Sequence, residues 1–484
     1  MKERFLELVK EGKTNEQILT IIKAENKGKV TLLKAADKLT LPQRARFVTE
    51  NWRTIRNQAT LPTVHTEWTG ADQPVQYLKS IKDLHNWTLN PDTHKSHVSV
   101  DVDGTCSGIQ VYAMLYRDKA AAHGVNVSPS ETVQDIYGTV AAEMVKIIEG
   151  CLEDRTSHRK LYDFIQEHGR EVFTELSKVF INRKHTKRIV MTLTYGLTNF
   201  GILGYSEEAI EALGEDNFKD AKKAKMAFAK VVSIALDKAA ECAVIGMKFT
   251  QKISKYCAAK GIGLQWTSPV GFKAFRATEA VEDYQIEVFT KSRKQITCDD
   301  GTKNFVTAGA SNILRDEKRT GELSASKQSN AVAPDVIHDL DAALLMRTVT
   351  KGHSKGITKF KLVHDSFGTT AKWIPTLNTS IREACVDIAQ GNFMQEWAVE
   401  VTRSENWEEC VEKVNEWAGE KVSRTKLDNA IKSKKPSEEK IATLQADYTS
   451  KLELEIAKKG ISDDDIKQGD FVLEDVMKSK HVFS

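Results

Sequence analysis

The sequence predicts an α+β fold that is mostly helical and contains a small antiparallel sheet. Helical periodicity covers most of the 484 residues, and strand-like alternation is confined to short segments. The strand signals are clearest at 97–103, 264–308 and 359–371, where turn residues separate apolar runs. One core is not enough for a chain of this length, so two or three subdomains are expected.

The first 90 residues are expected to form helices separated by polar breaks, at 3–11, 15–26, 42–58 and 74–85. A strand at 97–103 then leads through the turn GTCSG into the apolar segment IQVYAMLYRD. The next helix is expected to be capped at Ser130, because Ser-Glu-Thr and an apolar 3.6-residue stripe follow there.

The stretch 158–258 is expected to be helical with a break near 196–206, where Gly196, Gly201 and Gly204 lie. Beyond it, Ser-Pro-Val-Gly predicts a hairpin within 264–277. Asp-Asp-Gly at 299–301 predicts the turn of a β-rich ribbon at 284–308.

Helix returns at 331–350, and residues 359–371 predict a strand, a tight turn and a second strand. The very charged tail at 405–468 is expected to be mostly helical. Lys-Lys-Pro-Ser at 434–437 is expected to be a helix junction.

Composition excludes several classes of protein. Hydrophobic residues are 40% and charged residues 28%, and no apolar run approaches the roughly 18 residues needed to span a bilayer. The N-terminus lacks the apolar core of a secretory signal, so we expect a cytosolic protein. The seven cysteines form no CxxC pair, which argues against structural zinc or a disulfide framework. A net charge of +3 means that any basic surface must be local.

Two aspartates lie where a metal site is expected. Asp103 ends the first strand and is followed by Gly104, and Asp365 lies with His364 in the later tight turn. Two-metal nucleotidyl transfer needs carboxylates from different strands that converge on ions about 4 Å apart. Mg²⁺ takes oxygen ligands and keeps waters and substrate phosphates, so two aspartates and the Gly104 carbonyl suffice. Asp101, on the same strand face, stays open as an alternative ligand.

A helix between these segments carries groups suited to a nucleotide. A spacing of four residues places one set of side chains on a single helical face: Arg183, Lys187, Met191 and Tyr195. The two cations are expected to bind the triphosphate and to stabilise the leaving pyrophosphate, while the apolar and aromatic groups face the base and the sugar. Gly196 is expected to let a template base approach the backbone closely.

The ordered motifs resemble those of the single-subunit RNA polymerases of phages and mitochondria. They are DGTCSGIQ with a following YRD, SPSETVQDIYG, TKRIVMTLTYG, APDVIH and LVHDSFGT. The resemblance covers roughly 42–400 and the final DVMKSKHVFS, which is similar to a terminal segment tucked near the family's active site. It implies a DNA-directed RNA polymerase with the palm and fingers of a right-hand polymerase fold.

The resemblance also implies roles for individual residues. Asp103, Gly104 and Asp365 are expected to hold Mg²⁺. The expected catalytic residues are Asp103, Asp365, Lys187, Tyr195 and His364. The expected nucleotide-binding residues are Arg183, Lys187, Arg188, Met191, Tyr195, Gly196, His338 and Tyr137, of which Tyr195 and His338 monitor the sugar and the minor groove.

The implied domains are a helical lead-in at 1–95, a palm at 96–120 and 328–484 that includes the charged insertion at about 405–468, and fingers at 121–327. The expected reaction is attack of an RNA 3′-hydroxyl on the α-phosphate of an NTP, directed by a DNA template.

The ribbon at 284–308 lies where the family carries its promoter-reading hairpin. Its Lys291, Arg293 and Lys294 are either contacts to nucleic acid or ordinary solvated cations.

The choice of RNA over DNA rests on two positions. Related DNA polymerases have a glutamate five residues after the metal-binding aspartate, where it crowds the 2′-hydroxyl. This chain has Gly108 there, which is expected to leave space for a ribose. Tyr195 is then expected to offer its hydroxyl to the 2′-OH.

The family's Asp-x-x-Gly-Arg motif, its N-terminal promoter-binding region and its thumb have no match in this sequence. We therefore expect the larger, catalytic polypeptide of a split phage polymerase, with a second polypeptide that carries the N-terminal half. Two alternatives stay open. One is an inactive nucleic-acid-binding subunit that keeps the fold, and the other is a DNA polymerase or primase, which Gly108 disfavours.

Overall fold

The computed structural model describes residues 41–71, 73–153, 158–298, 300–420 and 438–483. The helices predicted at 3–11 and 15–26 and the junction at 434–437 lie outside these residues. Two compact units are present. The first holds the described residues up to Val102 with Gly356–Leu362 and Phe367–Leu377, and the second holds Asp103–Lys355, Val363–Ser366 and Asn378–Ser484. The assignment of residues to palm and fingers stays a prediction.

The helices of the first unit are α4 (Leu41–Glu50), α5 (Trp52–Thr60) and α6 (Pro74–Leu89), with the short η2 (Glu67–Gly70) between the last two. The prediction of a single helix at 42–58 is therefore wrong. Two helices are present, and they are separated at Asn51, whose side-chain amide donates to the Phe47 carbonyl at 2.8 Å. A small core of Ile55, Ala59 and Ile81 joins α5 to α6.

A three-stranded sheet contains the strands that were predicted around the aspartates. β1 (Ser99–Asp103), β6 (Lys361–Val363) and β7 (Ser366–Thr370) lie in the order β1-β7-β6. His364 and Asp365 form the turn between β6 and β7, and His364 has a left-handed φ of 53°. A Cβ on Gly368 would lie 2.1 Å from Asp101 Oδ1, so the close approach of β7 to β1 requires glycine there.

Helices make up most of the second unit. From α7 to α15 they are α7 (Ser107–Leu115), α8 (Lys119–Gly124), α9 (Ile136–Leu152), α10 (Arg159–His168), α11 (Glu171–Lys178), α12 (Arg183–Leu193), α13 (Asn199–Leu213), η3 (Glu215–Asn217), α14 (Ala221–Ala239) and α15 (Glu241–Ala259). Every residue of α7 is buried, which explains why its sequence is apolar on all sides.

The remaining elements include the predicted hairpin of β2 (Leu264–Thr267) and β3 (Lys273–Arg276). The later helices are α16 (Ala325–Ser354), η4 (Ala371–Trp373), α17 (Ile374–Ile388), α18 (Phe393–Thr402), α19 (Trp407–Gly419), α21 (Glu438–Lys459), η5 (Asp463–Asp465) and η6 (Leu473–Lys478). Small antiparallel hairpins among many helices confirm the predicted α+β class. Across the described ranges, no helix is both long enough and apolar enough to cross a bilayer.

Two helix boundaries were predicted wrongly. The helix expected from Ser130 begins at Ile136 and is capped by Asp135, because the Ser130 hydroxyl instead bonds Thr132 within a turn. The expected break at 196–206 instead covers 194–198, between α12 and α13, and includes Gly196, which has a φ of +79°. Gly201 and Gly204 lie inside α13.

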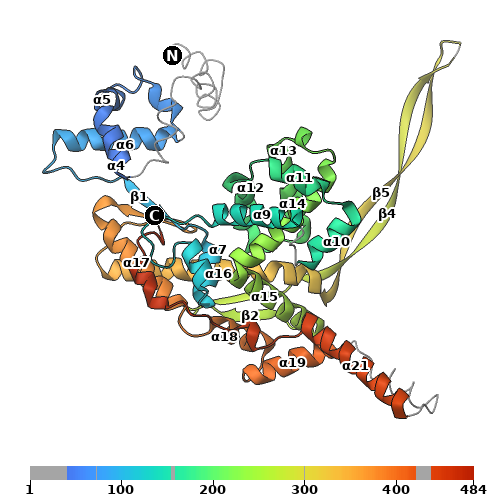
Figure 1. Cartoon of the computed structure of the whole chain (residues 1–484). Helices are drawn as coiled ribbons and strands as arrows, with labels where there is room; N and C mark the ends of the chain where they lie inside the picture. Colours follow the sequence, from blue (N-terminus) through green and yellow to red (C-terminus); the bar gives the residue numbers. More distant parts are fainter. Residues whose placement is uncertain (1–40, 72, 154–157, 299, 421–437, 484) are drawn as a thin grey trace. The chain divides into compact units, whose positions relative to one another are not determined.

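The predicted ribbon is longer than expected. β4 (Glu279–Thr297) and β5 (Lys303–Leu323) pair antiparallel, with Thr297 opposite Lys303, and Figure 1 shows them as two paired yellow strands. The prediction of 284–308 missed residues 279–283 and 309–323, the end of the ribbon away from its turn, where few residues are apolar. The side chains of Lys291, Arg293 and Lys294 lie outside the described part, so their role stays a prediction.

Candidate active site

The end of β1 and the β6–β7 turn meet at one backbone contact. The Gly104 amide donates to the Asp365 carbonyl oxygen at 3.3 Å. A Cβ built on Gly104 would lie 3.7 Å from Asp365 Oδ2, so the Asp365 carboxylate lies beside the residue that follows Asp103. Strand, turn and glycine therefore bring the two predicted ligands together.

The two carboxylates interact electrostatically. Partial burial and the negative charge of Asp365 raise the pKa of Asp103, while the Gly104 amide and the Lys187 ammonium lower it. Two acidic groups that repel each other, with one cation nearby, form a site that a divalent cation would stabilise. No cluster of three or more His, Cys, Asp or Glu side chains with metal-binding spacing occurs within the described residues. Two carboxylates fit Mg²⁺, which is usually held by one or two carboxylates and keeps waters and substrate phosphates.

Asp101, the alternative ligand, has other partners. It accepts hydrogen bonds from Lys361 and from the Ser99 hydroxyl, the latter at 2.6 Å. Although burial raises the pKa of Asp101, these hydrogen bonds and the Lys361 charge lower it overall. Asp101 is thus neutralised by Lys361, whereas Asp103 interacts with Asp365.

Helix α12 carries the predicted cations, of which Lys187 acts on Asp103. Its first turn is fixed by a capping box between Asn182 and His185. Arg183 Nε contacts Asp135 Oδ2 at 3.0 Å, and its guanidinium lies 5.0 Å from the centre of the Tyr137 ring. The Tyr137 hydroxyl donates to the Thr105 carbonyl at 2.7 Å, which ties this assembly to the loop after Asp103.

Tyr137 is only 4% exposed, and its hydroxyl already donates to the Thr105 carbonyl. These contacts place the Tyr137 ring under the Arg183 guanidinium. Lys187 is exposed and lowers the pKa of Asp103. Arg188 makes different contacts, with Glu208 Oε2 at 2.7 Å and with the Tyr205 ring at 4.7 Å. Arg188 is therefore held by α13, and the site roles predicted for Arg183, Lys187 and Arg188 stay predictions.

Tyr195 does not lie on the α12 face, because the helix ends at Leu193 with Thr194 as its C-cap. This corrects the prediction that four side chains share one helical face, although Met191 remains 43% exposed on the helix. The Tyr195 ring lies 5.1 Å from the His338 ring of α16, at an interplanar angle of 34°. The structure thus brings together the two residues expected to monitor the sugar.

Two polar residues beside Tyr195 were missed from the sequence. Ser107 Oγ lies 3.2 Å from the Tyr195 hydroxyl and donates to Asp341 Oδ2 at 3.2 Å. Burial raises the pKa of Asp341 to about 7, and the charge of Asp365 adds to the shift. The spacing in the sequence held a signal, because Asp341 lies three residues after His338 and so on the same face of a helix.

Two glycines have structural explanations. A Cβ on Gly108 would lie 2.1 Å from Thr194 Oγ1, so glycine lets the start of α7 touch the end of α12. The expectation that Gly108 leaves open space for a ribose stays a prediction. A Cβ on Gly196 would lie 2.8 Å from the Asn330 carbonyl oxygen, and the approach of a template base there stays a prediction.

The last described residues pack against the loop that follows Asp103. Gly104 forms an isolated antiparallel bridge with Phe483, which is 3% exposed. The Gln110 side-chain amide donates to the carbonyls of Val482 at 2.8 Å and Val125 at 3.0 Å. The sequence prediction of a terminal segment near the site agrees with these contacts.

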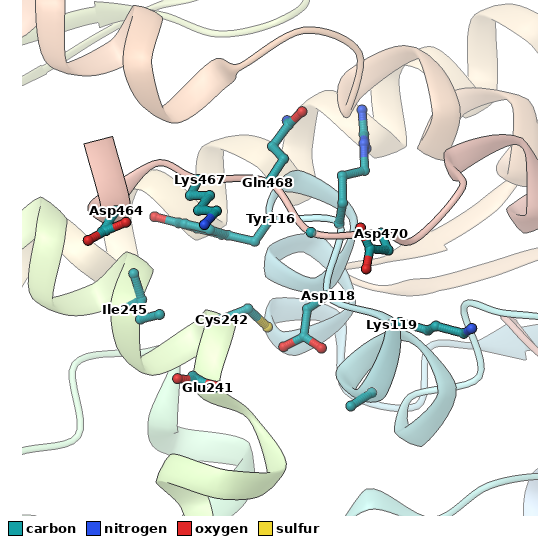
Figure 2. A pocket seen from close by; sticks show the side chains of 13 residues that line it. Tyr116, Asp118, Lys119, Glu241, Cys242, Ile245, Asp464, Lys467, Gln468 and Asp470 are labelled. Atoms are coloured by element: carbon teal, nitrogen blue, oxygen red, sulfur yellow. The ribbon is translucent and has the colours of Figure 1, made fainter. Parts of the chain in front are cut away.

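Two cavities lie outside the aspartate pair. One of about 480 Å³ is formed by the β2–β3 hairpin and α16 and includes His338. The other, of about 380 Å³, lies among α8, α15 and residues 464–470, and Figure 2 shows the Cys242 thiol pointing toward Asp118 in its wall. Burial and the Asp118 charge raise the pKa of Cys242, so this thiol stays protonated and unreactive.

Comparisons with known proteins agree with this geometry. The profile of a family described as DNA-dependent RNA polymerase matches residues 19–484. T7 RNA polymerase of Escherichia phage T7 is 28% identical over 380 residues, which cover 72% of this chain and 41% of the phage protein. The DNA-directed RNA polymerase of Enterobacteria phage T3 is 27% identical over 385 residues, covering 74% and 42%.

A mitochondrial polymerase is similar to this chain as well. The mitochondrial DNA-directed RNA polymerase of Mus musculus is 27% identical over 374 residues, covering 76% of this chain and 28% of the mouse protein. The chain thus spans less than half the length of these relatives. The family match nevertheless extends over nearly the whole sequence, including both aspartates and the helix between them. The chain therefore belongs to the phage-type family of DNA-dependent RNA polymerases.

Proposed function

We propose that this chain is the catalytic part of a DNA-directed RNA polymerase that adds NTPs to an RNA 3′ end. The observation that carries the proposal is the meeting of Asp103 and Asp365 at the Gly104–Asp365 hydrogen bond, with Lys187 close enough to lower the pKa of Asp103. A strand end and a hairpin turn supply carboxylates from different segments, which is the arrangement that two-metal nucleotidyl transfer requires.

Asp103, Asp365 and the Gly104 carbonyl would hold Mg²⁺. When bound, the metal lowers the pKa of the attacking hydroxyl and neutralises charge on the phosphates. The protein's own groups do the rest. Arg183, held by Asp135, and Lys187 bind the triphosphate and stabilise the leaving pyrophosphate.

Sugar recognition is proposed for the Tyr195–His338 pair. Burial raises the pKa of Tyr195 to about 12, so its hydroxyl stays protonated at working pH and can take part in hydrogen bonds with the 2′-OH. His338 supports the ring and lies beside the 480 Å³ cavity. His364 is exposed in the turn between β6 and β7. We propose that its left-handed backbone conformation, and not its ring, positions Asp365 in the site.

The test is extension of a labelled RNA primer on a DNA template by the purified chain with NTPs and Mg²⁺. We expect template-dependent addition that EDTA abolishes. Asp103→Asn serves as the inactive control. A folded chain that binds the primer–template and adds no nucleotide would support the alternative of an inactive nucleic-acid-binding subunit. Preference for dNTPs would support the DNA polymerase alternative.

The second polypeptide and the cytosolic location stay part of this proposal. The aligned regions account for 41% and 42% of the two phage relatives, so much of their length lies outside the match. Light scattering of the chain purified from its natural source would measure whether it is bound to another polypeptide. A fully active monomer would remove the second polypeptide from the proposal.

A further inference from the structure

Three polar side chains from three different segments form a chain of hydrogen bonds beside the Tyr195 ring. Tyr195 follows α12, Ser107 begins α7 and Asp341 lies in α16. The Ser107 oxygen is 3.2 Å from both the Tyr195 hydroxyl and Asp341 Oδ2. Ser107 is 5% exposed, so water has little access to the middle of this chain.

The direction of these hydrogen bonds follows from the chemistry of the groups. Ser107 Oγ donates its single hydrogen to Asp341 Oδ2, which can accept whether Asp341 is ionised or carries its proton on Oδ1. Ser107 Oγ is then left as an acceptor toward Tyr195, whose hydroxyl stays protonated. The Tyr195 hydrogen points at Ser107, and the lone pairs of its oxygen point elsewhere. They are free to accept a hydrogen bond from a ribose 2′-OH.

Asp341 itself is incompletely bonded. Its Oδ1 is buried and has no hydrogen-bond partner within the described residues. Leaving a buried acceptor unpaired destabilises the fold, which a purely structural tether between α7 and α16 would not require. Charges near the group come from Asp365, which disfavours its ionisation, and not from a cation that would pair with it.

We propose that Asp341 is a positioning residue for ribose selection, which acts through Ser107 to orient the Tyr195 hydroxyl as an acceptor for the 2′-OH of the incoming nucleotide. This inference rests on the proposed function and deepens it. It assigns the preference for ribonucleotides to a relay of three residues, Asp341, Ser107 and Tyr195.

The test is competition between ATP and dATP for the same template position, with the full chain on an RNA–DNA scaffold. We expect Ser107→Ala and Asp341→Asn each to reduce the preference for ATP by roughly 3- to 10-fold, the effect of one misdirected hydrogen bond. In the Tyr195→Phe background, adding Ser107→Ala should change the preference by less than about twofold, because no hydroxyl remains to be oriented.

Asp339→Asn is the matched control. Asp339 lies on the same helix but accepts from Trp266 Nε1 at 3.0 Å, so its loss should leave the ATP preference unchanged. Thermal unfolding of each variant checks the fold. An unchanged preference in folded Ser107→Ala and Asp341→Asn overturns the proposal. So does an equal loss with and without the Tyr195 hydroxyl, because the effect would then not pass through that group.

A second measurement separates this inference from the proposed function. On a primer that lacks its 3′-hydroxyl, the ratio of the Kd values for ATP and dATP can be measured without turnover. If the wild-type chain adds no nucleotide, the proposed function fails and this ratio alone decides the inference. We expect Ser107→Ala to bring the two Kd values closer together, and equal ratios in variant and wild type overturn it.

Discussion

Single carboxylates determine what this site can do, and their surroundings differ sharply over short distances in the chain. Asp101 is paired with Lys361, whereas Asp103, two residues later, is raised in pKa by burial and by Asp365. The same side chain is thus a neutralised surface group in one case and a candidate ligand in the other. Only the partners distinguish them.

Asp103→Asn and Asp365→Asn should each reduce kcat at least about a hundredfold, because a neutral amide is a poor ligand for Mg²⁺. This corresponds to an increase of roughly 2.7 kcal/mol in the activation free energy. Asp101→Asn is the control, and its activity should stay within about threefold of wild type. Primer extension at saturating NTP measures all three. If either ligand variant keeps more than about a hundredth of wild-type kcat while circular dichroism shows an intact fold, that residue is not an essential ligand.

Asp341 allows a prediction about stability and pH. Its pKa rises from an ordinary value of 3.8 to about 7, so the folded state binds this proton more tightly than the unfolded state. The stabilisation is complete below about pH 4 and is lost as the pH rises through 7. The side chain of the Asp341→Asn variant is neutral at every pH. The free energy of unfolding of wild type should therefore fall relative to that of the variant by about 1–3 kcal/mol between pH 5 and pH 8.

Urea unfolding of both proteins in EDTA, at the two pH values, measures this difference. Groups other than Asp341 titrate in both proteins and cancel in the comparison. A gap between variant and wild type that is the same at pH 5 and pH 8 would mean that the carboxyl titrates normally.

At the scale of elements, close contacts between helices build the site. Gly108 lets α7 touch Thr194 at the end of α12, and this contact sets Ser107 beside Tyr195. Gly204, inside α13, has open space at its Cβ position. A side chain would therefore clash at Gly108 and would meet no neighbour at Gly204.

Gly108→Ala should therefore destabilise the protein by about 1–3 kcal/mol, because the new methyl group overlaps Thr194. Gly204→Ala should instead stabilise it by roughly 0.5–1 kcal/mol, since alanine favours a helix interior and meets no neighbour. Chemical denaturation compares the two variants with wild type. Equal effects of the same sign would show that the contact between α7 and Thr194 is looser than described.

Sequence reasoning succeeded where local patterns decide the structure. The alternation at 97–103 and the turn at His364 and Asp365 predicted the strands, at whose ends Asp103 and Asp365 lie. It failed where particular hydrogen bonds decide. Asp135 rather than Ser130 caps α9, and Ser107 meets Asp341 across 234 positions of the chain, neither of which periodicity reveals.

At the scale of the whole molecule, the chain passes between its two compact units at five points. The sheet of the first unit depends on this path, because β1 has β7 as its neighbour and β7 lies more than 250 residues later. A continuous N-terminal piece of the chain therefore contains the helices of that unit without its complete sheet.

A fragment of residues 41–102 should keep protection of the α5 and α6 amides, whose core of Ile55, Ala59 and Ile81 lies within it. Its β1 amides should exchange at least about a hundredfold faster than in the full chain, because their hydrogen-bonding partner is missing. Hydrogen exchange followed by NMR measures both. Protected β1 amides in the fragment would contradict the sheet order described above.

The bond between Gln110 and Val482 also has a consequence in time. The two residues are 372 positions apart. At about 5–20 residues per second, a ribosome needs roughly 20–70 s to make the chain between them. During that interval Asp103 and its loop already exist, but the segment that pairs with Gly104 does not. A ribosome that stops just short of Val482 releases a chain that has every proposed ligand and an unfinished loop around them, so the order of synthesis itself delays the first moment at which the site can be complete.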